Sequence, residues 1–355
     1  MSIPNDERVF ESGYILWAKT RPRARFDLAT SGVPGCPLAD LGVAIEDLEI
    51  NGPGGYGYAP LRDAISDEYG VATECIVAAG GASGANAYAF LLLLRPGDEA
   101  LVEFPAYDIL PNLARFTGAS VKRFTRNPID PDEIARLMSP ATKLIVLTNP
   151  HNPSSALADE LSLTRIGEIA ARHGAHVLVD EAYLDCVWDA RPRSAFHLGA
   201  NFIATGSLTK FYGLSGLRCG WIFAPAAIAE RLWRLIDLFD NIPSYPSELL
   251  SVVAFRKLDA LRERSKRLIE TNRAIYREFA QRHGYDVPRY GTVAFPRVMD
   301  GSTGPLCEAL YENYETAVVP GEFFEMPEHV RISLAVPPET LREGLDRFEE
   351  ALGRQ

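Results

Sequence analysis

Short apolar runs alternate with helix-like segments from Cys75 to Phe223. The runs are bounded by glycine, proline and polar residues, as is typical of buried strands, and apolar residues recur at helical spacing in the segments between them. Strands are expected at 76–79, 99–103, 121–124, 143–147, 176–179, 202–204 and 219–223. Helices are expected at 84–94, 108–117, 131–138 and 159–173. This order predicts an α/β fold with a mostly parallel seven-stranded sheet and helices on both faces.

The pattern changes on either side of this region. A helix is expected from Pro60 to Gly70, and residues 14–17 form an apolar patch that must pack on something. Beyond residue 224 we expect a helix at 228–239, a break at 241–246, and one long or interrupted helix at 247–283. Strands at 293–297, 316–320 and 330–335 and helices at 305–314 and 338–352 follow. This last part predicts a smaller α/β domain.

Composition narrows the class of protein. The chain has 355 residues, of which 47% are apolar and 23% charged, as in globular proteins. Its net charge is −11 without a basic cluster, which argues against nucleic acid or an anionic membrane as partner. Met1–Arg8 lacks the apolar run of a signal peptide, and the longest apolar run, 85–94, is too short to span a bilayer. The five scattered cysteines predict reduced thiols and no metal site, so we expect a cytoplasmic protein.

The strongest candidate chemistry is the lysine of Ser207-Leu208-Thr209-Lys210. Placed at a strand end among apolar neighbours, Lys210 would be partly desolvated, which favours its neutral, nucleophilic amine. Ser207 and Arg218 offer a hydroxyl and a guanidinium, which suit a phosphate group. An aldehyde held by the amine, together with a phosphate, indicates pyridoxal phosphate. The alternative is a surface lysine beside a structural arginine, which is the commoner outcome for an isolated S-x-x-K.

Four other motifs also follow predicted strands, and the carboxyl ends of strands are where ligands gather in such sheets. The glycine turn 80–84 opens a helix whose free N–H groups suit an anion. Tyr107 follows the second strand, Asn149-Pro150-His151-Asn152-Pro153 follows the fourth, and Asp180-Glu181-Ala182-Tyr183 ends the fifth. Each motif alone has an ordinary structural explanation, but their order along the chain favours a shared site.

This order resembles the fold-type I pyridoxal-phosphate enzymes, in particular the class I and II aminotransferases, over nearly the whole chain. The resemblance implies that Lys210 forms the Schiff base and that Asp180 pairs with the pyridine nitrogen. It implies that Asn152 and Tyr183 donate to the ring O3′ and that Tyr107 stacks on the ring. Phosphate contacts are implied for Ser207, Arg218, Ala82 and Ser83. Arg331 matches the arginine that binds the substrate α-carboxylate, and Gly32 and Asn152 are expected beside the substrate.

The resemblance also implies the organisation of the molecule. Residues 1–45 would join a small domain, residues 46–245 would form the large cofactor-binding domain, and residues 246–355 would form the C-terminal small domain. Active sites shared across a homodimer are implied, with a tyrosine of the loop 51–58 reaching the partner's cofactor phosphate. Tyr56 is the preferred candidate and Tyr58 the alternative. One departure concerns the N-P-H-N-P motif, which Ser154-Ser155 follows where the family commonly has Thr-Gly.

The implied activity is exchange of an amino group between an α-amino acid and a 2-oxo acid. A lyase, decarboxylase or cyclising synthase that uses the same residues is the alternative, because fold and cofactor do not determine which Cα bond breaks. A pyridoxal-phosphate-binding regulator without catalysis is less favoured, because no DNA-binding extension is visible. The identity of the amino donor does not follow from these motifs.

Overall fold

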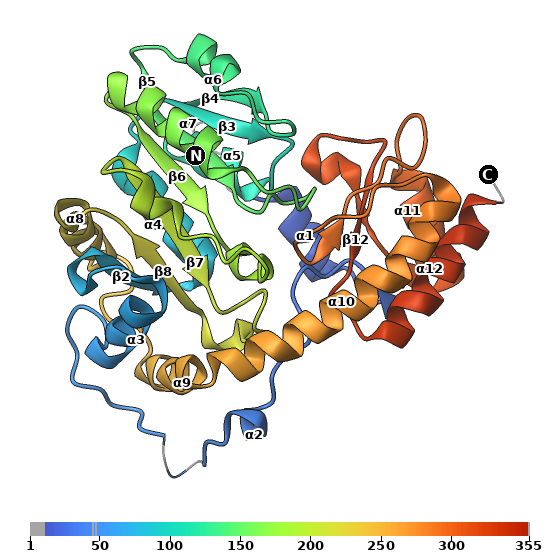
Figure 1. The fold of residues 1–355 in the computed structure, drawn as a ribbon, viewed down its shortest axis with the longest axis horizontal. Coiled ribbons are helices and arrows are strands. Elements are labelled where there is room, and N and C mark those ends of the chain that lie inside the picture. Colours follow the sequence, from blue (N-terminus) through green and yellow to red (C-terminus); the bar gives the residue numbers. More distant parts are fainter. Residues whose placement is uncertain (1–10, 45, 47, 354–355) are drawn as a thin grey trace, which may run out of the picture.

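A computed structural model describes residues 11–44, 46 and 48–353. Its largest sheet has seven strands in the order β2-β8-β7-β6-β5-β3-β4 (Figure 1). The strands are β2 (Ile76–Gly80), β3 (Glu99–Phe104), β4 (Ser120–Thr125), β5 (Thr142–Thr148), β6 (His176–Asp180), β7 (Phe202–Ser207) and β8 (Cys219–Phe223). All seven predicted strands are present. Only β8 runs against its two neighbours, so the mostly parallel sheet is confirmed.

Helices cover both faces of this sheet because successive strand residues point to opposite sides. On one face, Val102, Val146 and Leu178 form a core with helices α4 (Gly81–Leu93), α5 (Ile109–Phe116) and α8 (Ala226–Ile236). On the other, Ile145 and Val177 pack with helices α6 (Pro131–Leu137) and α7 (Glu160–Arg172). The strands therefore expose few side chains to water, and their carboxyl ends remain the accessible edge.

Local sequence signals account for several helix ends. Asp159 caps α7, since its side chain accepts a hydrogen bond from the Ser162 N–H, and Gly174 follows the helix with a φ of 65°. Helix α3 (Ala59–Tyr69) has Pro60 in its first turn and ends at Gly70. The predicted helix at 247–283 is two helices, α9 (Tyr245–Arg256) and α10 (Leu258–His283), that meet at Lys257.

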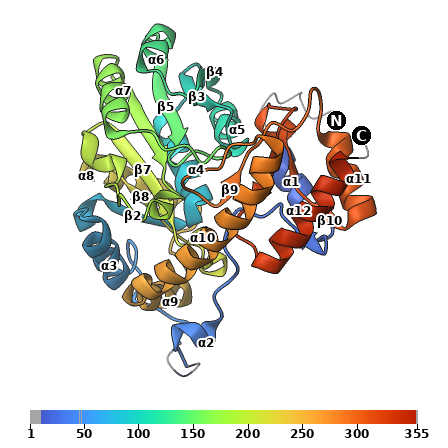
Figure 2. The ribbon, with the colours of Figure 1, turned by 45° about the vertical axis from the view of Figure 1, so that its right-hand side comes forward.

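The smaller part combines both ends of the chain. Strand β1 (Phe26–Asp27) pairs with β10 (Thr316–Ala317), and β12 (Val330–Ser333) lies between β11 (Val319–Pro320) and β9 (Val293–Ala294). Helices α10, α11 (Gly304–Tyr314) and α12 (Pro338–Leu352) pack beside these strands (Figure 2). The predicted strand at 316–320 is thus two strands in different sheets. The predicted strand at 293–297 is shorter, with a single bridge from Arg297 to His329.

Helix α1 (Gly13–Thr20) was not predicted. Ser12 caps it, because its Oγ accepts from the Ile15 N–H at 3.1 Å. Its Tyr14 packs with Val319 and Phe324 of the smaller part, which answers what the apolar patch at 14–17 packs against. The remaining short elements are α2 (Leu38–Leu41) and the 3₁₀ turns Thr73–Cys75, Leu184–Cys186, Ala195–Leu198, Ser215–Leu217 and Gly321–Phe324.

None of the helices in the described part of the chain has the length and apolarity needed to cross a membrane. The expectation for Met1–Arg8 concerns residues outside that part. The domain limits at 45 and 246 stay predictions. α9, which follows the second limit, packs against α3 beside the large sheet, whereas α10 packs against α12 in the smaller part.

Candidate functional site

A cavity of about 540 Å³ opens at the carboxyl edge of the large sheet, where the smaller part meets it. Most of the predicted site residues line it, although they come from seven separate segments of the chain. These residues are Ala82, Ser83, Tyr107, Asn152, Asp180, Tyr183, Ser207, Lys210, Arg218 and Arg331. The strand-end placement expected from the sequence therefore describes one continuous site.

Lys210 lies in the loop from β7 to β8 and points into this cavity. Its Nζ donates a hydrogen bond to Ser31 Oγ at 3.0 Å. Burial, together with the Arg331 and Arg218 cations, lowers the pKa of Lys210 to about 8, whereas the Asp180 carboxylate opposes this shift. The amine therefore carries a much larger neutral fraction near pH 8 than an ordinary lysine.

Asp180 is buried at the end of β6. Its two oxygens accept hydrogen bonds from neutral donors, Asn86 Nδ2 at 2.7 Å and the Ala182 N–H at 3.0 Å. Asn86 is fixed in turn, because its Oδ1 accepts from Thr205 Oγ1 at 2.7 Å. Burial raises the pKa of Asp180. A cation placed against this carboxylate would hold it ionised.

Arg331 extends from β12 into the cavity and is 1% exposed. Its three hydrogen bonds go to neutral oxygens: Asn152 Oδ1 at 3.2 Å, the Tyr14 hydroxyl at 2.6 Å and the Ala29 carbonyl at 3.2 Å. Its Nε has no partner among the described residues. A buried guanidinium with only neutral partners is suited to a carboxylate ligand, which would supply the missing charge and a matching planar fork.

The loop after β5 holds Asn152 against Arg331. The Asn152 N–H donates to Thr148 Oγ1 at 2.9 Å, and that hydroxyl donates to the buried Glu103 carboxylate at 2.7 Å. Glu103 forms an ion pair with Arg126 at 2.9 Å. The loop is therefore tied to β3 and β4 beneath the site.

Two tyrosines enclose the middle of the cavity. Burial raises the pKa of Tyr183 to about 12, so its hydroxyl remains protonated as a donor. Tyr107 packs edge-on against Tyr14, with their ring centroids 5.9 Å apart. Burial likewise raises the pKa of Tyr107.

The far end of the cavity is suited to an anion. Helix α4 begins there without a side-chain cap, so its first N–H groups are free near Ala82 and Ser83. Arg218 donates to the Gly80 carbonyl at 2.8 Å, and a Cβ on Gly81 would lie 2.7 Å from its Nη2. Thr209 Oγ1 is buried without a hydrogen-bond partner among the described residues.

The structure leaves two predicted residues outside the cavity lining. Gly32 lies beside it, and the Lys210 backbone is so near that a Cβ on Gly32 would be 3.5 Å from the Lys210 Cα. Tyr56 is elsewhere: its hydroxyl bonds with Asp237 at 3.1 Å, and its ring lies against Trp233. Within this chain, Tyr56 therefore makes no contribution to the cavity.

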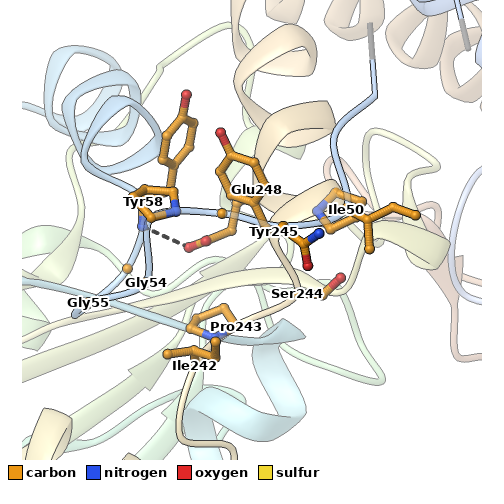
Figure 3. A pocket seen from close by; sticks show the side chains of 14 residues that line it. Ile50, Gly54, Gly55, Tyr58, Ile242, Pro243, Ser244, Tyr245 and Glu248 are labelled. Atoms are coloured by element: carbon orange, nitrogen blue, oxygen red, sulfur yellow. Dashed lines mark hydrogen bonds between the residues drawn. The ribbon is translucent and has the colours of Figure 1, made fainter. Parts of the chain in front are cut away.

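The alternative, Tyr58, lines a second hollow of about 400 Å³ with the break at 242–246 (Figure 3). Its N–H donates to the Glu248 carboxylate at 2.9 Å, and its ring packs edge-on against Tyr245. This hollow is distinct from the cavity around Lys210. The choice between Tyr56 and Tyr58 as a residue lent to a partner stays a prediction.

Sequence reasoning missed several side chains that line the cavity, among them Ser31, Asn86, Thr148, Thr209 and Lys19. Asn86 and Ser31 had no local signal, since their partners Asp180 and Lys210 lie 94 and 179 residues away. Thr209 stood inside the S-L-T-K motif and could have been included. Tyr14 belongs to the apolar patch that was expected to pack, and it does pack, but its hydroxyl also accepts a hydrogen bond from Arg331.

Comparison with known proteins identifies the family. Residues 49–348 match the family described as Aminotransferase class I and II. The chain belongs to this family. It is 31% identical over 361 residues to capreomycidine synthase of Streptomyces vinaceus, and this match covers 95% of this chain and 92% of the synthase. It is 28% identical over 324 residues to a probable aspartate/prephenate aminotransferase of Thermus aquaticus, spanning 83% and 82%.

Two solved structures superpose on this chain over nearly its whole length. A PLP-dependent aminotransferase from Streptococcus suis has a TM-score of 0.90 at 26% identity, covering 100% of this chain and 99% of that one. The PLP-dependent cyclase OrfR has a TM-score of 0.88 at 25% identity, covering 99% and 100%. The fold is therefore that of the fold-type I aminotransferases, and the cofactor is pyridoxal phosphate.

The residues present fit this cofactor. The free N–H groups of α4, Arg218 and the unpartnered Thr209 hydroxyl suit its phosphate. The buried Asp180, which has neutral donors only, suits its ring nitrogen, and the Lys210 amine suits its aldehyde.

Proposed function

We propose that this protein exchanges an amino group between an α-amino acid and a 2-oxo acid. The observation that carries the proposal is the presence of Arg331 and Lys210 in one cavity. Arg331 is a buried cation with neutral partners, suited to an α-carboxylate, and Lys210 is an amine with a pKa of about 8, suited to moving a proton. A substrate held by its carboxylate would present its Cα to that amine.

The remaining residues have roles that follow from their surroundings. When bound, pyridoxal phosphate supplies an aldehyde that condenses with amines and a ring that accepts electron density from the substrate Cα. Asp180 would keep the ring nitrogen protonated, and Asn152 and Tyr183 would donate to the ring oxygen. Ala82, Ser83, Ser207 and Arg218 would hold the phosphate through N–H, hydroxyl and guanidinium groups. Tyr107 would cover the ring and exclude water.

Lys210 would act at two moments through the same atom. Its Nζ would hold the cofactor in the resting protein and, when free, would take and return the proton of the substrate Cα. A pKa near 8 suits both roles, because a large fraction of the amine is neutral and can bind an aldehyde or accept a proton, and it is still basic enough to hold that proton. Lys210→Ala should therefore lose the covalent label that borohydride creates between pyridoxal phosphate and the wild-type chain, as detected by peptide mass spectrometry.

Product stoichiometry tests the reaction. With an amino donor and no oxo acid, an aminotransferase forms at most one equivalent of oxo acid per active site, because the amino group stays on the enzyme. Adding 2-oxoglutarate should then allow many turnovers. A panel of the L-amino acids, followed by mass spectrometry, would identify the donor. If no donor yields acceptor-dependent turnover, the proposal fails.

A cyclising synthase is the second candidate. It is favoured by the capreomycidine synthase match, which spans 95% of this chain against 83% for the aspartate/prephenate aminotransferase, and by the likeness to the cyclase OrfR. Such an enzyme would turn over repeatedly without any oxo acid and would keep the amino nitrogen in its product. The same panel separates the two candidates, since only one of them depends on an acceptor.

We propose a homodimer as the active unit. Five large hydrophobic side chains are exposed in or near the loop 51–58 and the break at 241–246, namely Ile50, Tyr56, Leu238, Phe239 and Ile242. Exposed apolar patches often mark protein interfaces, and a second copy would cover this one. We also propose a cytoplasmic location, in keeping with five free cysteines.

A further inference from the structure

The loop after β5 meets the smaller part through a serine in an unusual backbone conformation. Ser155 is 4% exposed and has a φ of 60°, in the left-handed region that a residue with a Cβ adopts reluctantly. Its Oγ donates to the Val293 carbonyl of β9 at 2.8 Å. Glycine would adopt this conformation without strain but would lack the hydroxyl, so serine here adds a bond between the two segments despite some backbone strain.

The segment 291–293, which Ser155 contacts, leaves room for the serine side chain. Gly291 also has a positive φ, of 76°, and a Cβ there would overlap with the Ser155 hydroxyl. A serine on one side and a glycine on the other therefore form a close contact between the loop after β5 and the smaller part. A larger side chain at 291 would push the two apart.

Thr292 extends this contact in two further directions. Its buried Oγ1 donates to the Ser31 carbonyl at 2.7 Å, and Ser31 Oγ accepts from Lys210 Nζ. Its own carbonyl accepts from the Leu334 N–H at 2.7 Å, just beyond β12. The segment 291–293 thus touches the loop of Asn152, the neighbour of Lys210, and the strand that carries Arg331.

We propose that Ser155 and Thr292 are positioning residues that set the separation between Asn152 and Arg331. Asn152 lies three residues before Ser155 in one loop, and Arg331 lies on β12, so the 3.2 Å bond between them crosses the cavity. The Ser155 hydroxyl joins the loop of Asn152 to β9, which pairs with β12. The Thr292 hydroxyl joins the same segment to Ser31, two residues from the Ala29 carbonyl that accepts from Arg331. Losing either hydroxyl should loosen the substrate side of the cavity and leave the phosphate end, built from α4 and Arg218, unchanged.

Kinetics give the first test, which rests on the proposed function. Ser155→Ala and Thr292→Val each remove one hydroxyl, Thr292→Ser keeps it, and Ser265→Ala removes a buried serine hydroxyl of α10 as the matched control. With the best donor of the L-amino acid panel and 2-oxoglutarate, we expect KM for the donor to rise roughly three- to tenfold in the first two variants. Pyridoxal-phosphate affinity should change less than twofold. Thr292→Ser and Ser265→Ala should resemble the wild type. An unchanged KM, or equal losses in cofactor affinity, overturns the proposal.

Hydrogen–deuterium exchange gives a second test that needs no activity. The full-length protein saturated with pyridoxal phosphate is compared in wild-type and variant forms, and peptides covering 150–158 and 290–295 are followed. Thr292→Val should speed exchange in 150–158 about threefold or more, although Thr292 forms no bond with that loop, and Ser155→Ala should speed exchange in 290–295. If each variant alters only its own peptide, the proposal is wrong. If the exchange is coupled but no amino donor is found, the proposed function fails and the positioning role stands.

Discussion

Replacing Arg331 by methionine should damage catalysis and leave the protein at least as stable as before. The side chain is 1% exposed, and its hydrogen bonds reach only neutral oxygens of Asn152, Tyr14 and Ala29. A buried charge without a counter-charge is unfavourable in the free protein. A residue kept at such a position is explained by what it binds rather than by what it stabilises.

The size of the effect follows from the bond that would be lost. A charge-assisted pair in a desolvated site contributes on the order of 2–5 kcal/mol when one partner is truncated. At about 1.4 kcal/mol per decade, this predicts a loss in kcat/KM of roughly 30-fold to several thousandfold. Arg331→Lys should recover little of it, because an ammonium lacks the planar fork. Cofactor affinity should stay near the wild-type value, since the residues proposed to hold the phosphate lie at the other end of the cavity.

Steady-state kinetics with the best donor and a thermal melt of the cofactor-free protein measure the two effects together. Arg297→Met is the matched control: it removes an arginine from the same part of the molecule, but one that is paired with Asp300 at the surface. The control should keep near-normal kcat/KM. If Arg331→Met also turns over normally, the carboxylate assignment is wrong. If it lowers Tm by many degrees, the reasoning about an uncompensated charge is wrong.

Three further predictions follow from other sites. Burial lowers the pKa of Lys210 to about 8, so between pH 8 and about 10.5 the unfolded chain binds more protons than the folded one and stability rises with pH. Lys210→Met should therefore raise the free energy of unfolding of the cofactor-free protein at pH 7, by roughly 3 kcal/mol at most. Equal effects of the substitution at pH 7 and pH 10.5 would contradict this. Asp180→Asn keeps the shape and removes the charge, so kcat should fall about a hundredfold or more while bound cofactor, measured by absorbance, is retained; a kcat near the wild-type value would refute the pairing with the ring nitrogen. Ile242→Asp should shift the protein to monomer in sedimentation velocity, whereas Leu161→Asp, which alters an even more exposed apolar residue on α7, should not. If the wild type itself sediments as a monomer, the dimer proposal is wrong.

The large sheet could be predicted because its signals are local. Each strand is a short apolar run bounded by turn residues, and the order of strands and helices determines at which edge the motifs meet. Lys210, Asp180 and Asn152 therefore met in one cavity as expected. The predicted strand ranges differ from the observed strands by only a few residues at the ends.

The residues that were missed depend on contacts distant in sequence. Asn86 lies in an apolar helix, and nothing near it indicates that Asp180 is its partner. Tyr14 binds Arg331 across 317 residues, so the apolar patch at 14–17 could suggest packing but not this bond. The division between α9 and α10 at Lys257 has no proline or glycine to mark it. Ser155 gave a partial signal, because the departure from Thr-Gly drew attention to it, and the structure shows that its backbone is left-handed.

The reversed direction of β8 has a consequence for how the two halves of the cavity could change independently. Because β8 runs against β7, the connection between them, residues 208–218, leaves and re-enters the sheet at the same edge and carries both Lys210 and Arg218 into the cavity. Arg331, Tyr14 and Lys19 belong to other segments, from the two ends of the chain. If the proposed roles hold, substitutions at Arg331, Tyr14 or Lys19 would alter the substrate side of the cavity and leave the sequence of the β7–β8 connection unchanged. The residues proposed to hold the cofactor and those proposed to contact the substrate therefore lie on separate segments. Relatives with different reactions could share the first set and differ in the second.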